Sequence, residues 1–285
     1  MPTTTDATGN TLLDVLTPYE APFFTMERWG PASDGGYVVP AEVMRQANVL
    51  VSGGVSDNVE FEARVAREAT DIRIGLFDHT ISKAPDHTPS NATWHRLGLG
   101  DEPGFISLEE AALLSGAKPD EPVALKLDIE SSEWELLATT PATFWERVTV
   151  LMIELHGLDR ITDWSRYARL LGNLKSHLLL IHLHGNNYAR VVHLKREGIE
   201  IPIVMEATYI NRKLIPSSHR PEVWNHGAPT LIDRPNNPQI IDIAFDFWLD
   251  RKKSGVRRFL KRIGLYLLPW RVRKNIRLNF TPKSR

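Results

Sequence analysis

Apolar runs typical of buried strands alternate with segments of helical periodicity along most of the chain. The strand-like runs cover residues 48–52, 71–77, 92–98, 122–128, 148–155, 178–184 and 203–210. Helical spacing predicts helices over 58–68, 107–114, 131–137 and 162–174, and a helix-like segment over 191–197. This alternation predicts an α/β fold: a mostly parallel sheet with helices on both faces.

The ends of the chain and one internal segment depart from this pattern. Residues 1–27 form a loosely patterned N-terminal extension, and the predicted domain covers 28–250 with an irregular, Pro-rich flap over 216–238. Residues 251–285 place apolar side chains at helical spacing with Arg and Lys between them. The sequence therefore predicts a basic amphipathic helix after the domain.

Charge is divided unevenly between the domain and this tail. The total is −1, but residues 251–285 hold 13 of the 34 Lys and Arg and no acidic residue, so the first 250 residues carry −14. Such a tail suits an anionic membrane surface, and docking on the acidic domain or on a partner protein are the alternatives. We do not expect nucleic acid as a partner, because no recognised binding module accompanies the charge.

Composition limits the possible catalytic chemistry and the cellular compartment. The absence of cysteine excludes disulfides, thiolate catalysis and Cys-based zinc or iron-sulfur sites. No apolar stretch approaches the roughly 18 residues of a membrane span, and residues 1–10 lack the pattern of a secretory signal. We expect a cytoplasmic protein. If the tail binds anionic lipid, the protein would also attach peripherally to the inner face of the membrane.

Carboxylates and glycines follow the predicted strands at the ends where open α/β sheets bind ligands. Gly53 and Gly54 close the first strand, and Asp78 ends the next one 24 positions after Gly54. An acidic residue at an offset of about 20 holds ribose hydroxyls in nucleotide-binding βαβ units. An adenosine site is therefore one interpretation, and an ordinary turn with a solvated aspartate is the other.

Two further strand ends carry candidate catalytic groups. Asp128 and Glu154 lie 26 residues apart but become neighbours in a parallel sheet, where they suit a general base or a divalent cation. The cation is the less favoured alternative, since nothing completes a ligand set. His156 and His184 end the fifth and sixth strands, and neutral imidazole is a suitable base near pH 7. We expect His156 to be that base, with Glu154 beside it.

Five motifs in order carry a resemblance to a known family: Asp34-Gly-Gly-Tyr37, Ser52-Gly-Gly-Val-Ser-Asp57, Leu125-Lys-Leu-Asp-Ile-Glu130, Ile153-Glu-Leu-His156 and His184-Gly-Asn-Asn-Tyr188. This series resembles the FkbM-like family of S-adenosylmethionine-dependent methyltransferases. The resemblance implies a class I methyltransferase (Rossmann-like) fold and methyl transfer to a hydroxyl oxygen. From their positions at the strand ends, we expect cofactor contacts from Gly53, Gly54, Asp57, Asp78 and Asp128, and catalytic roles for His156, Glu154 and His184.

Two positions depart from the family pattern. Ser131 stands where the family usually has glycine, and Ser52 stands where many methyltransferases have an acidic residue. The contact to the methionine amino group is then left to Asp34, Asp57 or Asp128.

The expected function is O-methylation of a sugar, glycan or other polyol. The alternative is a catalytically silent nucleotide-binding or scaffold module recruited to membranes by its tail. An NAD-dependent oxidoreductase is disfavoured, because no Gly-x-Gly-x-x-Gly fingerprint is present.

Overall fold

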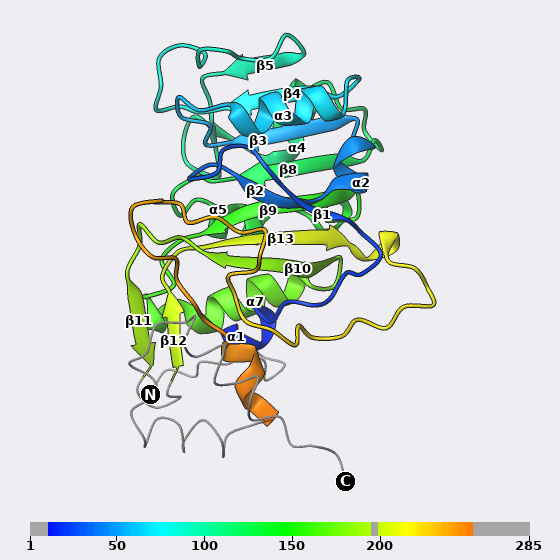
Figure 1. Cartoon of the computed structure of the whole chain (residues 1–285). Coiled ribbons are helices and arrows are strands. Elements are labelled where there is room, and N and C mark those ends of the chain that lie inside the picture. The colour runs from blue at the N-terminus through cyan, green and yellow to red at the C-terminus, as the bar shows by residue number, and fades with distance from the viewer. Residues whose placement is uncertain (1–10, 195–198, 253–285) are drawn as a thin grey trace.

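A seven-stranded sheet forms the centre of the protein (Figure 1). The computed structural model describes residues 11–194 and 199–252. The strand order is β10–β13–β9–β8–β3–β4–β5, and every pair is parallel except the two that β13 makes with β9 and β10. The strands are β3 (Val49–Gly53), β4 (Arg73–Phe77), β5 (Ala92–His95), β8 (Val123–Leu127), β9 (Val148–Leu155), β10 (Leu178–Gly185) and β13 (Met205–Asn211).

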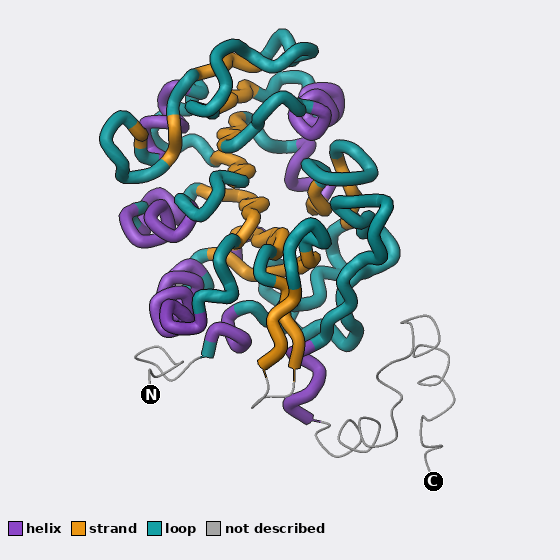
Figure 2. Tube along the Cα trace, turned by 90° about the vertical axis from the view of Figure 1, so that its left-hand side faces the viewer, coloured by secondary structure: helices purple, strands orange, loops and turns teal. Residues whose placement is uncertain are grey.

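Helices cover both faces of this sheet, as Figure 2 shows in edge view. One face packs against α1 (Leu12–Val15), α4 (Leu108–Leu114), α5 (Glu133–Thr139), α6 (Ala142–Trp145) and α7 (Trp164–Leu174). The other packs against α2 (Ala41–Arg45), α3 (Glu60–Glu68) and a hairpin of β1 (Met26–Trp29) and β2 (Tyr37–Pro40). The predicted mostly parallel sheet with helices on both faces is therefore confirmed.

The period-two alternation of strand side chains decides which residues face the hairpin. In β9, Leu151 and Ile153 lie in the core beneath α4 to α7, whereas Val150 and Met152 lie in the core beneath the hairpin. Glu154 continues the second series. The polar side chains at the ends of these strands are thus directed toward the β1–β2 side of the sheet.

Two smaller strand pairs and three short 3₁₀ helices complete the described elements. β6 (Gly98–Leu99) pairs with β7 (Phe105–Ile106), and β11 (Val191–Leu194) forms an antiparallel hairpin with β12 (Ile199–Pro202). The 3₁₀ helices are η1 (Ile161–Asp163), η2 (Arg212–Leu214) and η3 (Phe247–Lys252). The predicted helix-like segment over 191–197 is wrong for 191–194, where β-branched Val191 and Val192 favour the hairpin strand.

Sequence signals at helix starts have mixed outcomes. Ser107 caps α4 as predicted, in a capping box with Glu110. Ser132 occupies the N-cap of α5, but its side chain makes no capping hydrogen bond. Leu12 and Leu16, in the predicted extension, are fully buried in the same core as α7.

The segment over 215–246, called the strap below, has neither helix nor regular strand among its residues. This agrees with the predicted irregular stretch over 216–238. The predicted basic helix lies almost wholly in 253–285, outside the described residues, and membrane attachment through it stays a prediction. Among the helices that the structure describes, none combines the length and apolarity that a membrane crossing requires.

Candidate active site

A row of polar side chains crosses four adjacent strands at one end of the sheet. His184 of β10 pairs in register with Glu206 of β13, and Glu206 pairs with Glu154 of β9. Asp128 directly follows β8, the next strand in the sheet. We call these four residues the acidic row. It lies where the parallel strands β8, β9 and β10 end, the edge at which such sheets bind ligands.

Asp128 lies beneath the N-terminal hairpin. The Tyr37 hydroxyl donates to Asp128 Oδ2 at 3.1 Å, and Lys126 Nζ donates to the Gly54 carbonyl at 2.9 Å. Burial and then the nearby Glu154 carboxylate raise the pKa of Asp128 to about 7. A carboxyl group with that pKa accepts and releases a proton near neutral pH.

His156 is surrounded by carboxylates. Its Nε2 lies 3.2 Å from Glu154 Oε2 and 3.5 Å from Glu130 Oε2. Glu133 Oε1 lies 3.2 Å from Nδ1 and accepts the backbone N–H of His156 at 2.7 Å. Burial works to lower the pKa of His156, but the hydrogen bonds to Glu133 and Glu154 raise it to about 11.

These contacts bear on the expected role of His156 as a neutral base. An imidazole with a pKa of about 11 is a cation at pH 7 and is not available as a neutral base. The Asp128 carboxyl group, whose pKa is raised to about 7, is better suited to take a proton. Glu133, which contacts His156 from α5, is fully buried.

His184 lies at the other end of the row, enclosed by carboxylates. Its Nδ1 is 3.1 Å from Glu206 Oε2, and its Nε2 is 3.1 Å from Asp242 Oδ1 of the strap. Burial works to lower the pKa of His184, but hydrogen bonds to Asp242 and Glu206 raise it to about 10. Because both ring nitrogens are engaged and the side chain is fully buried, we assign His184 to holding the strap rather than to proton transfer.

Asparagines extend the same network. Asn236 of the strap donates to Glu206 Oε1 at 2.6 Å and to Asp34 Oδ1 at 2.8 Å. Asn186 donates to Glu154 Oε1 at 2.7 Å. The Asn187 amide donates to two strap carbonyls, so this residue is engaged within the protein rather than directed at a sugar.

Glycine at the turn after β3 is required by packing within the protein, independently of any ligand. Gly54 has a φ of +71°, and a Cβ on it would lie 1.6 Å from the carbonyl oxygen of Asp128. Gly53 is similarly tight, since a Cβ there would lie 2.5 Å from Leu99 Cδ1. These glycines therefore bring the ends of β3 and β8 together. Asp57, the third residue after Gly54, is exposed.

Asp78 ends β4 and organises the loops beside that turn. Its Oδ2 accepts the Ser56 N–H at 2.8 Å, and its Oδ1 accepts the Thr80 N–H at 2.8 Å and hydroxyl at 2.6 Å. Burial works to raise the pKa of Asp78, but these hydrogen bonds lower it below its ordinary value. The carboxylate is thus ionised, and a lone pair of Oδ2 stays free for another donor.

Glu62 is a site residue that sequence reasoning missed. The Ser52 hydroxyl donates to Glu62 Oε1 at 2.5 Å, and both side chains are buried. A carboxylate from α3 thus lies beside the position where many methyltransferases have an acidic residue at the end of the first strand. The available signal was a glutamate on the inward face of the predicted helix over 58–68.

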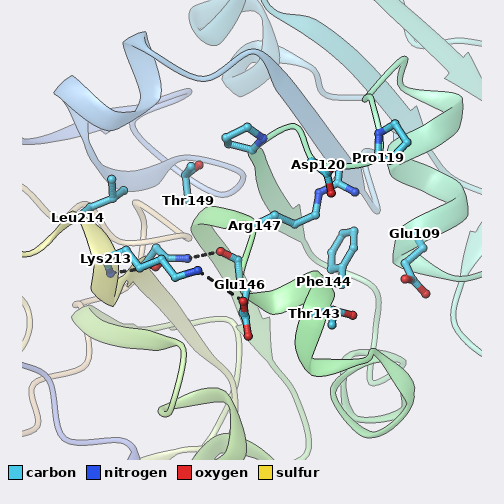
Figure 3. Close-up of a pocket in the computed structure, with 12 residues that line it drawn as sticks. Glu109, Pro119, Asp120, Thr143, Phe144, Glu146, Arg147, Thr149, Lys213 and Leu214 are labelled. Atoms are coloured by element: carbon cyan, nitrogen blue, oxygen red, sulfur yellow. Dashed lines mark hydrogen bonds and ion pairs between the residues drawn. The ribbon is translucent and has the colours of Figure 1, made fainter.

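A separate surface pocket of about 560 Å³ lies at the opposite end of the sheet, where β8 and β9 begin (Figure 3). Its lining includes Asp120, Phe144, Glu146, Arg147 and Lys213. Lys213 Nζ lies 3.5 Å from Glu146 Oε2, so charges of both signs are paired within it. We assign this pocket no role, because ligands of open α/β sheets bind beyond the carboxyl ends of the strands.

Strand order defines the fold. Numbered along the chain, the seven strands run 3-2-1-4-5-7-6 across the sheet with the seventh antiparallel, which is the arrangement of the class I methyltransferase fold. No protein-family model matches the chain, and no curated protein matches it.

Two solved structures are similar at low level. The chain aligns with precorrin-6y C5,15-methyltransferase from Geobacter metallireducens GS-15 at 10% identity and a TM-score of 0.30, over 59% of this chain and 83% of that one. It aligns with VP4 of bluetongue virus, whose structure revealed a multifunctional RNA-capping production line, at 12% identity and a TM-score of 0.26, over 49% of this chain and 24% of that one. The fold assignment rests on the strand order.

Proposed function

We propose that the protein is an S-adenosylmethionine-dependent methyltransferase that acts on a hydroxyl oxygen, the activity that the FkbM-like motifs imply. The observation that carries the proposal is the acidic row beside the Gly54 turn and Asp78, on a sheet with this strand order. A sugar or other polyol is the acceptor class that the motifs imply.

The chemistry of the available side chains fits the cofactor. A free lone pair on Asp78 suits a ribose hydroxyl, and the buried carboxyl of Asp128 suits the sulfonium and ammonium charges of the methionine end. The cofactor supplies an activated methyl group when bound: the acceptor O–C bond forms as the S–C bond breaks, and sulfur keeps the electron pair.

The protein must then position the hydroxyl and take its proton. Burial and then the nearby Glu154 carboxylate raise the pKa of Asp128 to about 7, so Asp128 accepts a proton near neutrality. Asn186 fixes one oxygen of Glu154, while the His156 cation lies against the other. General-base help of this kind contributes roughly 10²–10⁴-fold, and positioning supplies the larger share.

Calorimetric titration of the full chain with S-adenosylmethionine and, separately, NADH tests this proposal. We expect S-adenosylmethionine to bind and NADH not to bind. Asp78→Asn should weaken binding by about tenfold, because a charged acceptor of a ribose hydrogen bond becomes neutral. Asp71→Asn, an exposed aspartate at the other end of β4, is the matched control and should bind as the wild type does.

Three results would contradict the proposal. Binding of NADH alone would favour an oxidoreductase, and binding of neither compound would favour the scaffold hypothesis. Equal weakening by Asp71→Asn and Asp78→Asn would show that the cofactor is not held at the end of β4.

A further inference from the structure

Three side chains of the candidate active site converge on one point. One possible metal-ligating atom from each of Asp128, Glu130 and His156 lies within 4.8 Å of the other two. Glu154 adjoins them, with its Oε2 3.2 Å from His156 Nε2. Neighbouring ligands of an octahedral ion with bonds of about 2.1–2.4 Å lie roughly 3.0–3.4 Å apart. The separations of Nε2 from the Glu154 and Glu130 oxygens, 3.2 and 3.5 Å, are close to that spacing.

Asp128 and His156 are each held by a separate partner on the side away from the cluster. The Tyr37 hydroxyl bonds Asp128 Oδ2, which leaves Oδ1 of Asp128 outside that contact. Glu133 lies against Nδ1 of His156, so Nε2 is the nitrogen that faces Glu130 and Glu154. A carboxylate behind a histidine is the usual outer contact of a metal-bound imidazole, because it fixes the tautomer and the ring orientation.

A buried carboxylate behind the cluster is a second indication of a cation site. Glu133 is fully buried, and its Oε2 finds no hydrogen-bond partner among the described residues. Glu133 and Glu154 are buried beside His156, Asp128 is half-buried next to them and Glu130 is exposed. A cation bound at Nε2 of His156 would take the place of the proton there, and buried carboxylates are normally paired or coordinate a metal.

We propose that Asp128, Glu130 and His156, with Glu154 adjoining, bind one divalent cation of the Mg²⁺ or Mn²⁺ type. Two carboxylate oxygens and one imidazole nitrogen suit these ions, and open positions would be left for water or an acceptor oxygen. In a role that rests on the proposed function, the cation would bind the acceptor hydroxyl and lower its pKa, and the adjoining Glu154 would take the proton. The sequence alone did not complete the set of metal ligands. Glu130 and His156 come close to each other only when the turn after β8 is folded.

Titration of the full-length, chelator-treated protein with MnCl₂, followed by the electron paramagnetic resonance signal of free Mn²⁺, tests the site. We expect one bound Mn²⁺ per chain. Glu130→Gln should weaken binding at least tenfold and should fold normally, because its side chain is 87% exposed. Glu133→Gln should weaken it about 10- to 100-fold through His156, as loss of an outer contact does.

Glu135→Gln is the matched control, since it is the same substitution two residues further along α5 and pairs with Arg166 on the surface. It should leave Mn²⁺ binding unchanged. Absence of binding, or equal binding by wild type and Glu130→Gln, would overturn the metal site. S-adenosylmethionine calorimetry on the same metal-free samples separates the two proposals: cofactor binding without Mn²⁺ binding removes only the metal site, and the reverse removes only the methyltransferase.

Discussion

Replacing Ser131 with glycine should stabilise the protein, because the backbone there is in a left-handed conformation. Ser131 has a φ of +85°, directly after Glu130 at +52°. No hydrogen bond of the Ser131 side chain is seen within the described residues that would compensate for this. The turn thus adopts a conformation that glycine accepts without strain, at the position where the resembled family usually has glycine.

The expected gain is the difference between two opposing effects. A left-handed conformation costs a residue with a Cβ about 1–2 kcal/mol, whereas glycine gives the unfolded chain extra freedom worth about 0.4–1 kcal/mol. The net stabilisation is therefore about 0.5–1 kcal/mol. For a chain of this size that corresponds to a rise in Tm of about 1–2 °C.

Urea denaturation followed by tryptophan fluorescence measures the change, with Ser132→Gly as the matched control. Ser132 has a φ of −71° and makes no capping bond, so glycine there gives only the entropic cost. Ser131→Gly should raise the urea midpoint and Ser132→Gly should lower it, by about 0.5–1 kcal/mol in free energy of unfolding. Destabilisation by both variants would refute the argument from backbone strain.

Two further substitutions test the packing around the row. Gly54→Ala should abolish soluble, folded protein, because its Cβ would lie 1.6 Å from the Asp128 carbonyl oxygen. Gly104→Ala is the control: Gly104 has a φ of +89° and nothing within 4 Å of the added Cβ, so this variant should cost only the backbone strain. Comparable circular dichroism melts for the two variants would contradict this prediction. Asp233→Asn should destabilise the protein by roughly 3 kcal/mol near pH 7, because Asp233 Oδ1 lies 3.1 Å from His182 Nε2. Burial works to raise the pKa of Asp233, but the charge and hydrogen bond of His182 lower it. The contribution of Asp233 to the free energy of unfolding is therefore present above the unfolded pKa of about 3.9 and is lost as the pH falls further. The assignment would be refuted if the difference in free energy of unfolding between wild type and variant, measured in urea melts, already disappeared between pH 7 and 5.

Local pattern was sufficient to predict the sheet. Each predicted strand overlaps an observed strand of the central sheet. The signal is strongest for buried parallel strands such as β3 and β8, which are continuous apolar runs bounded by turn residues. The adjacency of Asp128 and Glu154 followed from the expectation that their strands are neighbours, which β8 and β9 confirm. The β1–β2 hairpin was missed, since its short strands lie within a segment that has no clear period.

Contacts between segments far apart in the sequence could not be predicted from the pattern of apolar and polar positions. The Tyr37 hydroxyl meets Asp128 across 91 residues, and Asn236 meets Asp34 across 202. The charge state of His156 depends on Glu133, which enters from the first turn of α5. Sequence spacing identifies a histidine at a strand end, but its protonation depends on groups that only the fold brings near.

The origin of these contacts explains how the acidic row is enclosed. Tyr37 comes from a hairpin that precedes the sheet, and Asn236 and Asp242 come from a strap that follows it, yet all three reach the same face of the sheet. Buried carboxylates repel one another unless cations or protons are supplied. Along the row, His184 supplies a charge to Glu206 and Asp242, and His156 supplies one to Glu154. Burial and then the nearby Glu154 carboxylate raise the pKa of Asp128 to about 7. A sulfonium, an ammonium or a divalent cation beside it would favour the ionised form, so Asp128 is the residue at which cofactor binding and metal binding are to be distinguished.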